Sequence, residues 1–155
     1  MHLIIVLLTM FVLPTGCVAY ERWASAAPVW LSVGKWFLFW GAGVRLAIAG
    51  VRQIAKPELT VTGIFGITDR AAFPLAQELG FWNLTIGVLA MLTLWRPAWI
   101  VPLAIAAGAF YAMAGVKHVA SASRSFEANT AMISDLWMAA ILLGFAAYAL
   151  VRGAG

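Results

Sequence analysis

Long apolar runs, separated by short polar or proline-containing segments, are the dominant pattern of this chain. Each run is close to the roughly 20 residues that a helix needs to cross the hydrocarbon core of a bilayer. Strands of a membrane barrel would alternate apolar and polar residues, and these runs do not alternate. The pattern predicts an all-α integral membrane bundle, a single domain over residues 1–155 with five transmembrane helices. The expected spans cover about residues 3–20, 29–54, 74–95, 98–116 and 128–150.

The composition supports the membrane class. Of the 155 residues, 64% are hydrophobic and 10% are charged, whereas soluble domains carry about 25% charged residues. Ten Lys and Arg exceed six Asp and Glu, and most of them lie between the apolar runs, where anionic lipid headgroups are found. The chain has no basic stripe and no RNA-binding motif. We therefore expect membrane lipids as partners and no nucleic acid.

The single cysteine, Cys17, ends a short apolar start, as it does in a lipoprotein signal. No Lys or Arg precedes it, however, and Pro14 stands where such signals have a leucine. We therefore expect a first span that is retained, with Cys17 as a small residue within it.

The connection between the second and third expected spans, residues 55–73, is the only long one. Pro57 ends the second helix, because proline cannot continue the hydrogen-bond ladder. Residues 60–67 are too apolar for a solvated loop, so we expect an interfacial or re-entrant segment that covers one end of the bundle. Asp69 is expected to cap the helical turn that follows.

Five spans place the two termini on opposite sides of the membrane; we name the side of the N-terminus side A and the other side B. Basic residues expected on side A are Arg52, Lys56, Arg70, Lys117 and Arg124, and those on side B are Arg22, Lys35, Arg96 and Arg152. The excess on side A predicts a cytoplasmic N-terminus in a bacterial inner membrane. Tryptophans typical of a membrane interface gather near side B: Trp23, Trp30, Trp36, Trp95 and Trp99.

Three ionisable residues, Arg45, Glu78 and Asp135, lie inside the apolar runs. An isolated charge at the bilayer centre costs roughly 2.5–3.5 kcal/mol on insertion scales, so each needs a partner, water or a function. At ~1.5 Å per residue, Glu78 is expected ~6 Å from the side A end of its helix. Arg45, Asn83 and Asp135 are each expected ~12–13 Å from the side A end of their own helices. Three more polar residues are expected near the side A rim: Gln53, His118 and Glu127. The polar groups of four helices are thus predicted to converge on side A.

Stripes of small residues run beside these polar groups at helical spacing. They are Gly43, Ala47 and Gly50 on the second helix, Gly80, Asn83, Gly87 and Ala90 on the third, and Gly108, Tyr111, Gly115 and His118 on the fourth. Such stripes let helices approach closely in a membrane. Packing alone accounts for the glycines, and an interhelical hydrogen bond accounts for Asn83.

The charged groups have two interpretations. Arg45 can neutralise Glu78 and Asp135 in a structural ion-pair network, or the three residues can form a functional site. His118 is either a solvated or capping residue at a helix end, or it exchanges protons with the carboxylates. The scattered carboxylates and histidine match no metal-ligand pattern, so we expect no metal. The residues identify no cofactor and no catalytic group.

Several short stretches resemble a known family. They are residues 43–50 running to Gln53 and Pro57, residues 73–75 and 78–81 with Asn83 and Gly87, residues 114–115 with His118, and Glu127 with Met132 and residues 134–136. Together they resemble a family of small uncharacterised bacterial membrane proteins that is distantly similar to the DoxX-like group, over residues 36–145. DoxX-like proteins are mostly four-helix bundles, and some are linked to quinol-oxidising or other membrane redox systems. The resemblance implies such a redox context and carries over no catalytic residues.

The leading hypothesis is that the bundle binds an amphipathic molecule, such as a quinone or another isoprenoid lipid, in a polar pocket open on one side. The candidate ligand-binding residues are Arg45, Gln53, Glu78, Trp82, Asn83, His118, Glu127, Asp135 and Trp137. One alternative is an enzyme in which Glu78 or Asp135 transfers protons and Arg45 stabilises charge. Two further alternatives are a small transporter and an accessory subunit of a membrane redox complex. The chain can also form a homo-oligomer. The side B halves of the last three spans lack ionisable residues, which argues against a continuous transport route.

Overall fold

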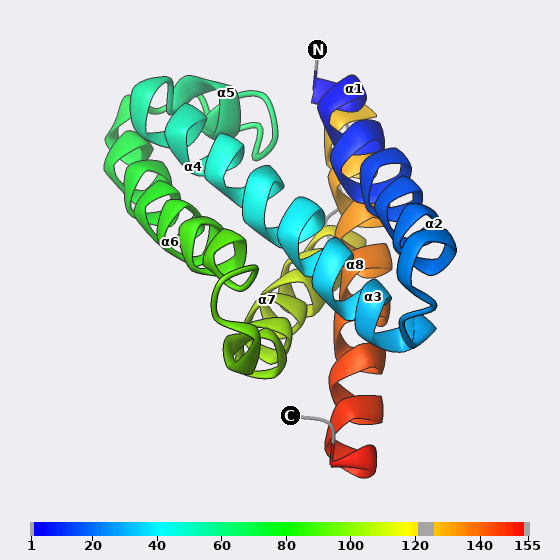
Figure 1. Ribbon diagram of the computed structural model, residues 1–155. Coiled ribbons are helices and arrows are strands. Elements are labelled where there is room, and N and C mark those ends of the chain that lie inside the picture. Colours follow the sequence, from blue (N-terminus) through cyan, green and yellow to red (C-terminus); the bar gives the residue numbers. More distant parts are fainter. Residues whose placement is uncertain (1, 121–125, 154–155) are drawn as a thin grey trace.

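The computed structural model describes residues 2–120 and 126–153, apart from the side chains of His2 and Glu127. This part of the chain is helical and contains no strand, and its helices form five rods (Figure 1). The first rod is α1 (His2–Leu7), η1 (Leu8–Val12) and α2 (Leu13–Ser25), and the second rod is α3 (Val29–Phe37), η2 (Leu38–Val44) and α4 (Arg45–Ala55). The other rods are α6 (Phe73–Leu92), α7 (Ile100–Ala120) and α8 (Phe126–Arg152), with the short elements α5 (Glu58–Val61), η3 (Arg70–Ala72) and η4 (Pro97–Trp99) between rods.

Four of the helices found in the described residues are long and apolar enough to cross a membrane, which indicates an integral membrane protein. They cover Leu3–Ser25, Arg70–Leu92, Pro97–Ala120 and Ala128–Arg152. The second rod is not among them. It carries three basic residues, Lys35, Arg45 and Arg52, and these lower its hydropathy. The structure thus shows four apolar spans of the five that the sequence predicted.

The helix ends differ from the predicted ones by a few residues. The first rod continues beyond residue 20 to Ser25, and Ala26 then takes a left-handed conformation with φ of 50°. A left-handed residue is a common way to end a helix. α6 ends at Leu92 instead of residue 95, because Arg96 precedes a proline and leaves the helical conformation, with φ of −133°.

The chain between the second rod and α6 folds over the end of the bundle where α1 begins (Figure 1). α5 starts directly after Pro57 and buries Thr60 and Val61. The predicted cap is confirmed, because the Asp69 carboxylate accepts a hydrogen bond from the Ala71 N–H at 2.9 Å. We call residues 57–67 the cap segment.

The rods pair most extensively as two hairpins, α4 with α6 and α7 with α8. Small residues let α4 and α6 approach closely, as the stripes predicted. A Cβ atom added to Gly50 would lie 2.6 Å from the Gly80 carbonyl oxygen, and one added to Gly87 would lie 2.6 Å from the Ala47 backbone nitrogen. Real Cβ atoms do not approach backbone so closely, so this seam requires glycine.

Two π-helical segments join the rods. η1 and η2 contact each other. A backbone carbonyl in each segment accepts a hydrogen bond from a side chain of the α7–α8 hairpin. The Tyr111 hydroxyl of α7 donates to the Gly41 carbonyl in η2 at 2.6 Å, and the Trp137 indole N–H of α8 donates to the Met10 carbonyl in η1 at 3.2 Å. π-helical turns of this kind often mark functional regions of a helix. Here they connect the first and second rods to the α7–α8 hairpin.

The hydrophobic core fills the space between the rods. It includes residues of every rod, among them Val6, Met10, Leu38, Ala42, Leu46, Ile86, Ala90, Ala104, Ala107, Met138, Leu142 and Phe145. Many of these side chains are small, which keeps the helices close.

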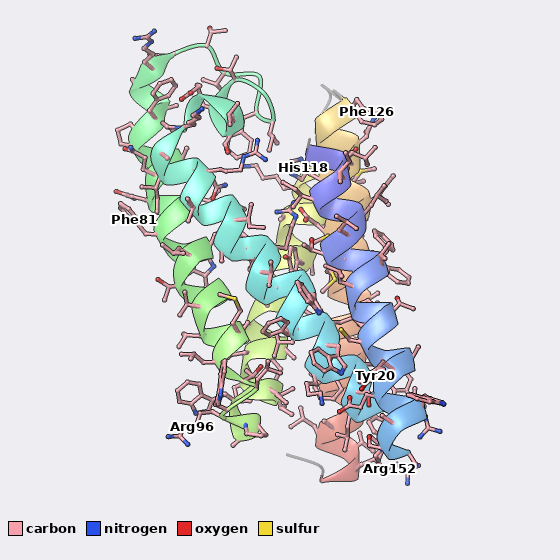
Figure 2. The ribbon with its side chains drawn as sticks, turned by 45° about the horizontal axis from the view of Figure 1, so that its top comes forward. Tyr20, Phe81, Arg96, His118, Phe126 and Arg152 are labelled. Atoms are coloured by element: carbon pink, nitrogen blue, oxygen red, sulfur yellow. The ribbon has the colours of Figure 1, made fainter. Side chains whose placement is uncertain are left out.

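Labelled residues identify the two ends of the bundle. Tyr20, Arg96 and Arg152 lie at one end, and His118 and Phe126 lie toward the other (Figure 2). The N-terminal end of the first rod shares the end of His118, which is therefore side A, and the opposite end is side B.

An ion pair between Lys35 and Glu21 joins the first and second rods at side B. The indole N–H of Trp36 donates to the same carboxylate at 2.8 Å. The other tryptophans expected at this interface are exposed: Trp23, Trp30, Trp95 and Trp99. Exposed indoles are typical of the headgroup region of a membrane protein.

Replacing Gly87 by alanine tests the close approach of α4 and α6. The added Cβ would meet the Ala47 backbone, which cannot give way without separating the helices, so we expect a loss of about 1–3 kcal/mol of unfolding free energy. Gly144→Ala in α8 is the matched control, because nothing lies within 4 Å of its added Cβ and alanine favours a helix. Equal unfolding free energies of the two variants in detergent would contradict the close contact of α4 and α6 at Gly87.

Candidate functional site

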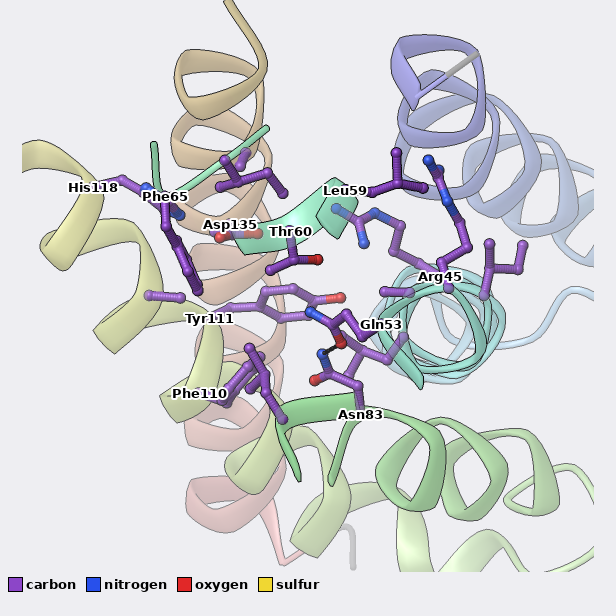
Figure 3. A pocket seen from close by; sticks show the side chains of 18 of the residues that line it. Arg45, Gln53, Leu59, Thr60, Phe65, Asn83, Phe110, Tyr111, His118 and Asp135 are labelled. Atoms are coloured by element: carbon purple, nitrogen blue, oxygen red, sulfur yellow. Dashed lines mark hydrogen bonds between the residues drawn. The ribbon is translucent and has the colours of Figure 1, made fainter. Parts of the chain in front are cut away.

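A cavity of about 410 Å³ lies at the side A end, between the α4–α6 hairpin and the α7–α8 hairpin and beneath the cap segment (Figure 3). Its polar lining consists of Arg45, Arg52, Gln53, Thr60, Asn83, Tyr111, Lys117, His118 and Asp135. Its apolar lining includes Ile5, Leu46, Ile48, Leu59, Ile64, Phe65, Leu79, Phe110 and Met113. The cavity therefore combines a polar surface from four rods with apolar walls.

Helical periodicity brings these side chains to one place. On α4, Arg45, Ala49 and Arg52 are four and then three residues apart, so they share the face that lines the cavity. Ala131 and Asp135 on α8 are likewise four residues apart. The second rod, α6, α7 and α8 thus each present one stripe of their surface to the same space.

Asn83 and Gln53 connect the two helices of the first hairpin. The Asn83 amide N–H donates to the Gln53 side-chain oxygen at 2.7 Å, and both residues are buried. This is the interhelical hydrogen bond that the sequence predicted for Asn83. The Asn83 carbonyl oxygen is buried without a hydrogen-bond partner, and the side chain is only 3% exposed. It can therefore accept one more hydrogen bond.

Arg45 and Asp135 lie on opposite sides of the cavity (Figure 3). They are 9% and 7% exposed. They form no ion pair with each other, and the ion pair found among the described side chains joins Lys35 to Glu21 at side B. The Arg45 Nε–H is buried without an acceptor. A network in which Arg45 neutralises carboxylates by direct contact is therefore not formed between described residues.

Tyr111 forms the wall of the cavity beside Asp135 (Figure 3). Its ring is 1% exposed, and its hydroxyl is used in the hydrogen bond to Gly41. Tyr111 lies on the small-residue stripe predicted for the fourth helix, but it was not among the predicted site residues. A phenol on a stripe of glycines, seven residues or two helical turns before His118, is the signal that would have identified it.

Arg52, Thr60 and Lys117 also line the cavity and were not predicted as site residues. Arg52 lies seven residues after Arg45, two helical turns along the same face, so the sequence spacing contains the signal. The Lys117 ammonium lies 5.4 Å from the centre of the Phe65 ring, a cation–π geometry that joins α7 to the cap segment. Thr60 is placed by the fold of the cap segment, for which the sequence has no periodic signal.

Of the nine predicted site residues, the structure brings five to the cavity: Arg45, Gln53, Asn83, His118 and Asp135. Glu78 and Trp82 are exposed on the face of α6 that points away from the glycine seam. Trp137 packs instead on the first rod, where its ring stacks on Phe11 with 5.4 Å between the ring centres. The side chain of Glu127 lies outside the described residues.

The charges of the cavity lining are predominantly positive. Arg45, Arg52 and Lys117 are cations, and Asp135 is the single carboxylate among the lining residues. No group of three or more His, Cys, Asp or Glu in the described part of the chain is arranged to hold a metal ion. The arrangement is suited to bind a polar or anionic group through donors while apolar walls hold a hydrocarbon part.

Tyr111→Phe tests the contact that holds this wall. The variant leaves the buried Gly41 carbonyl without its donor, so we expect a loss of about 0.6–1.7 kcal/mol of unfolding free energy. Tyr20→Phe is the matched control, because Tyr20 is exposed. Detergent unfolding followed by circular dichroism measures both variants. Equal stability of both variants and the unmodified protein would show that the Tyr111 hydroxyl contributes nothing.

One comparison with known proteins gives a match. The model of a family described as Family of unknown function (DUF6790) matches residues 1–153. No curated protein and no solved structure matches the chain. The site must therefore be interpreted from its own geometry.

Proposed function

We propose that this chain, which belongs to the DUF6790 family, binds an amphipathic lipid-like or quinone-like small molecule in the side A cavity. The observation that carries the proposal is a pair of buried polar atoms without partners, the Arg45 Nε–H and the Asn83 carbonyl oxygen, in the lining of one cavity. A buried polar group without a hydrogen bond costs about 1–3 kcal/mol. A ligand that satisfies both atoms would recover this free energy on binding.

The size and lining of the cavity support a small-molecule ligand. Its volume of about 410 Å³ falls within the ~300–1,000 Å³ typical of such sites. The apolar walls, which include Phe110 and Met113, suit a hydrocarbon chain, and the polar side chains of the same lining suit a polar head. Met113 lines the cavity and is 67% exposed, so the cavity reaches the outer surface of α7 at this residue. A chain can leave the bundle there into the lipid.

The proposed setting is a bacterial inner membrane with five spans. The second rod pairs with the apolar α6 along the glycine seam, and α1 begins and α8 ends at opposite ends of the bundle (Figure 1). Both features support a second rod that crosses beside its neighbours, with Arg45 and Arg52 turned to the cavity. In this arrangement the cap segment lies at the side A interface, and side A faces the cytoplasm. Three sequence-based alternatives stay predictions: an accessory role in a DoxX-like redox complex, assembly into a homo-oligomer, and transport.

Arg45→Gln tests the binding proposal. The variant removes a charge and the unpartnered Nε–H, so we expect about tenfold weaker binding, which corresponds to about 1.4 kcal/mol. Native mass spectrometry of the purified protein with a decyl-chain benzoquinone and a lysophospholipid measures binding. Arg45→Lys keeps the charge without the Nε–H and is expected to bind with intermediate affinity.

The matched control for Arg45→Gln is Glu78→Gln, which changes an exposed residue outside the cavity and should bind like the unmodified protein. Thermal unfolding in the same detergent checks that all variants are folded. The proposal would be abandoned if neither probe bound to the unmodified protein, or if Arg45→Gln bound both probes as tightly as Glu78→Gln did.

A second candidate function is an enzyme that transfers protons to or from the bound molecule. The observation that favours it is Asp135, whose carboxylate lines the cavity, is largely buried, and makes no hydrogen bond or ion pair with another described residue. A carboxylate with free acceptor positions beside a ligand is suited to act as a general base. Arg45 would stabilise charge that develops on the ligand.

The enzyme hypothesis predicts turnover that depends on Asp135. Asp135→Asn keeps the shape of the side chain and removes the base, so we expect product formation to fall by about 10²-fold or more. Mass spectrometry of the probe molecules after incubation with protein detects any product. Product formation that persists in Asp135→Asn would remove Asp135 from the reaction, and the absence of any product would remove the enzyme hypothesis.

A further inference from the structure

We infer that the head of the bound molecule is anionic and also carries a hydroxyl group, as in a glycerophosphate ester with a single acyl chain. The inference rests on the proposed function and names its ligand class. Two independent properties of the cavity lead to it: the balance of charges, and the kinds of hydrogen bond that its buried atoms lack.

The first property is the charge of the lining. Three cations, Arg45, Arg52 and Lys117, face one carboxylate, Asp135, which leaves two formal positive charges without a counter-charge among the lining residues. Arg45 is buried, Arg52 is half-buried and Lys117 is exposed, so the repulsion is strongest at Arg45, which is the most shielded from water. A neutral head, such as that of a quinone, leaves this repulsion in place. A phosphate group relieves it, and Arg is especially suited to phosphate because its fork of donors fits two oxygens.

The second property is the type of the unpartnered atoms. The Arg45 Nε–H is a donor and needs an acceptor, which a phosphate oxygen supplies. The Asn83 carbonyl oxygen is an acceptor, and its own amide N–H is already used on Gln53. An ionised phosphate diester has no donor to offer Asn83. A hydroxyl on the same head supplies that donor, so one group satisfies Arg45 and the other satisfies Asn83.

The positions of the residues fit a head of this kind. Gln53 lies between Arg45 and Asn83 in the lining, and its hydrogen bond holds Asn83 in place (Figure 3). The cap segment contributes Leu59, Thr60, Ile64 and Phe65 and covers the polar part from side A. Lys117 contacts the Phe65 ring and therefore lies where the cap segment meets α7. The head is thus surrounded by donors, while the acyl chain follows the apolar wall to Met113.

Matched probes separate the two properties. The purified full-length protein in a neutral detergent is titrated with four palmitoyl- or hexadecyl-chain probes: lysophosphatidylglycerol, lysophosphatidylcholine, monoacylglycerol and hexadecyl methyl phosphate. Only the first combines a net negative charge with hydroxyl groups on its head, so we expect it to bind about tenfold or more tightly than each of the others. Glycerol 3-phosphate without a chain is the fifth probe, and we expect it to bind at least 10²-fold more weakly than the lysolipid.

The outcomes distinguish the inference from the proposed function. Binding of monoacylglycerol or lysophosphatidylcholine as tight as that of lysophosphatidylglycerol would overturn the anionic head and leave the amphiphile site standing. Binding of hexadecyl methyl phosphate as tight as that of the lysolipid would overturn the hydroxyl requirement, because this ionised diester has no hydrogen-bond donor. Tight binding of glycerol 3-phosphate would overturn the lipid source, because a water-soluble ester would then suffice. No binding of any probe would overturn the proposed function itself.

Variants at two cations that are not fully buried test the charge without disturbing the core. Arg52→Gln and Lys117→Gln are each expected to weaken the binding of lysophosphatidylglycerol about fivefold and to leave the binding of monoacylglycerol unchanged. At high salt, the loss of lysophosphatidylglycerol affinity is expected to be smaller. The matched controls are Arg70→Gln and Lys56→Gln, which are exposed, lie on side A and do not line the cavity. Equal effects of the lining and control variants, or equal losses for charged and neutral probes, would overturn the role of these cations.

Discussion

The close approach of α4 and α6 is the constraint on which the rest of this bundle depends. Gly50 and Gly87 each lie so near the backbone of the facing helix that a Cβ atom does not fit. In lipid there is no hydrophobic force between helices, so such contacts and interhelical hydrogen bonds hold them together. The seam brings Gln53 within hydrogen-bond distance of Asn83 and turns one stripe of α4 to the interior. Arg45 and Arg52 belong to that stripe, so helix packing determines where the cations lie.

The same packing explains why a cavity remains at side A. Two tightly joined hairpins meet along a core of small and apolar side chains, and the π-helical segments connect them near Gly41 and Met10. Nearer side A the space between the hairpins is lined by polar side chains and covered by the cap segment. Buried groups such as the Arg45 Nε–H are then left without partners within the protein. A site that lacks internal partners is suited to receive them from a ligand.

The part of the site that could be predicted is the depth of each residue along its helix. A rise of ~1.5 Å per residue places Arg45, Asn83 and Asp135 at similar depth whatever the packing. The direction in which a side chain points around the helix depends on the neighbouring helices. Glu78 and Trp82 have a suitable depth but lie on the outer face of α6, and Trp137 turns to the first rod. α6, α7 and α8 are apolar around most of their circumference, so the sequence contains little information on direction there.

The sequence by itself determined that the chain is an all-helical membrane protein, that small residues line the seams between helices, and that polar groups gather toward one side. Length, hydropathy and helical spacing are local properties, and local properties are sufficient for these conclusions. Only the tertiary structure decided that Arg45 and Asp135 stand apart across a cavity, that Tyr111 forms its wall, and that the cap segment covers it. These features depend on which helices pair and how each is rotated, and contacts between distant residues set both.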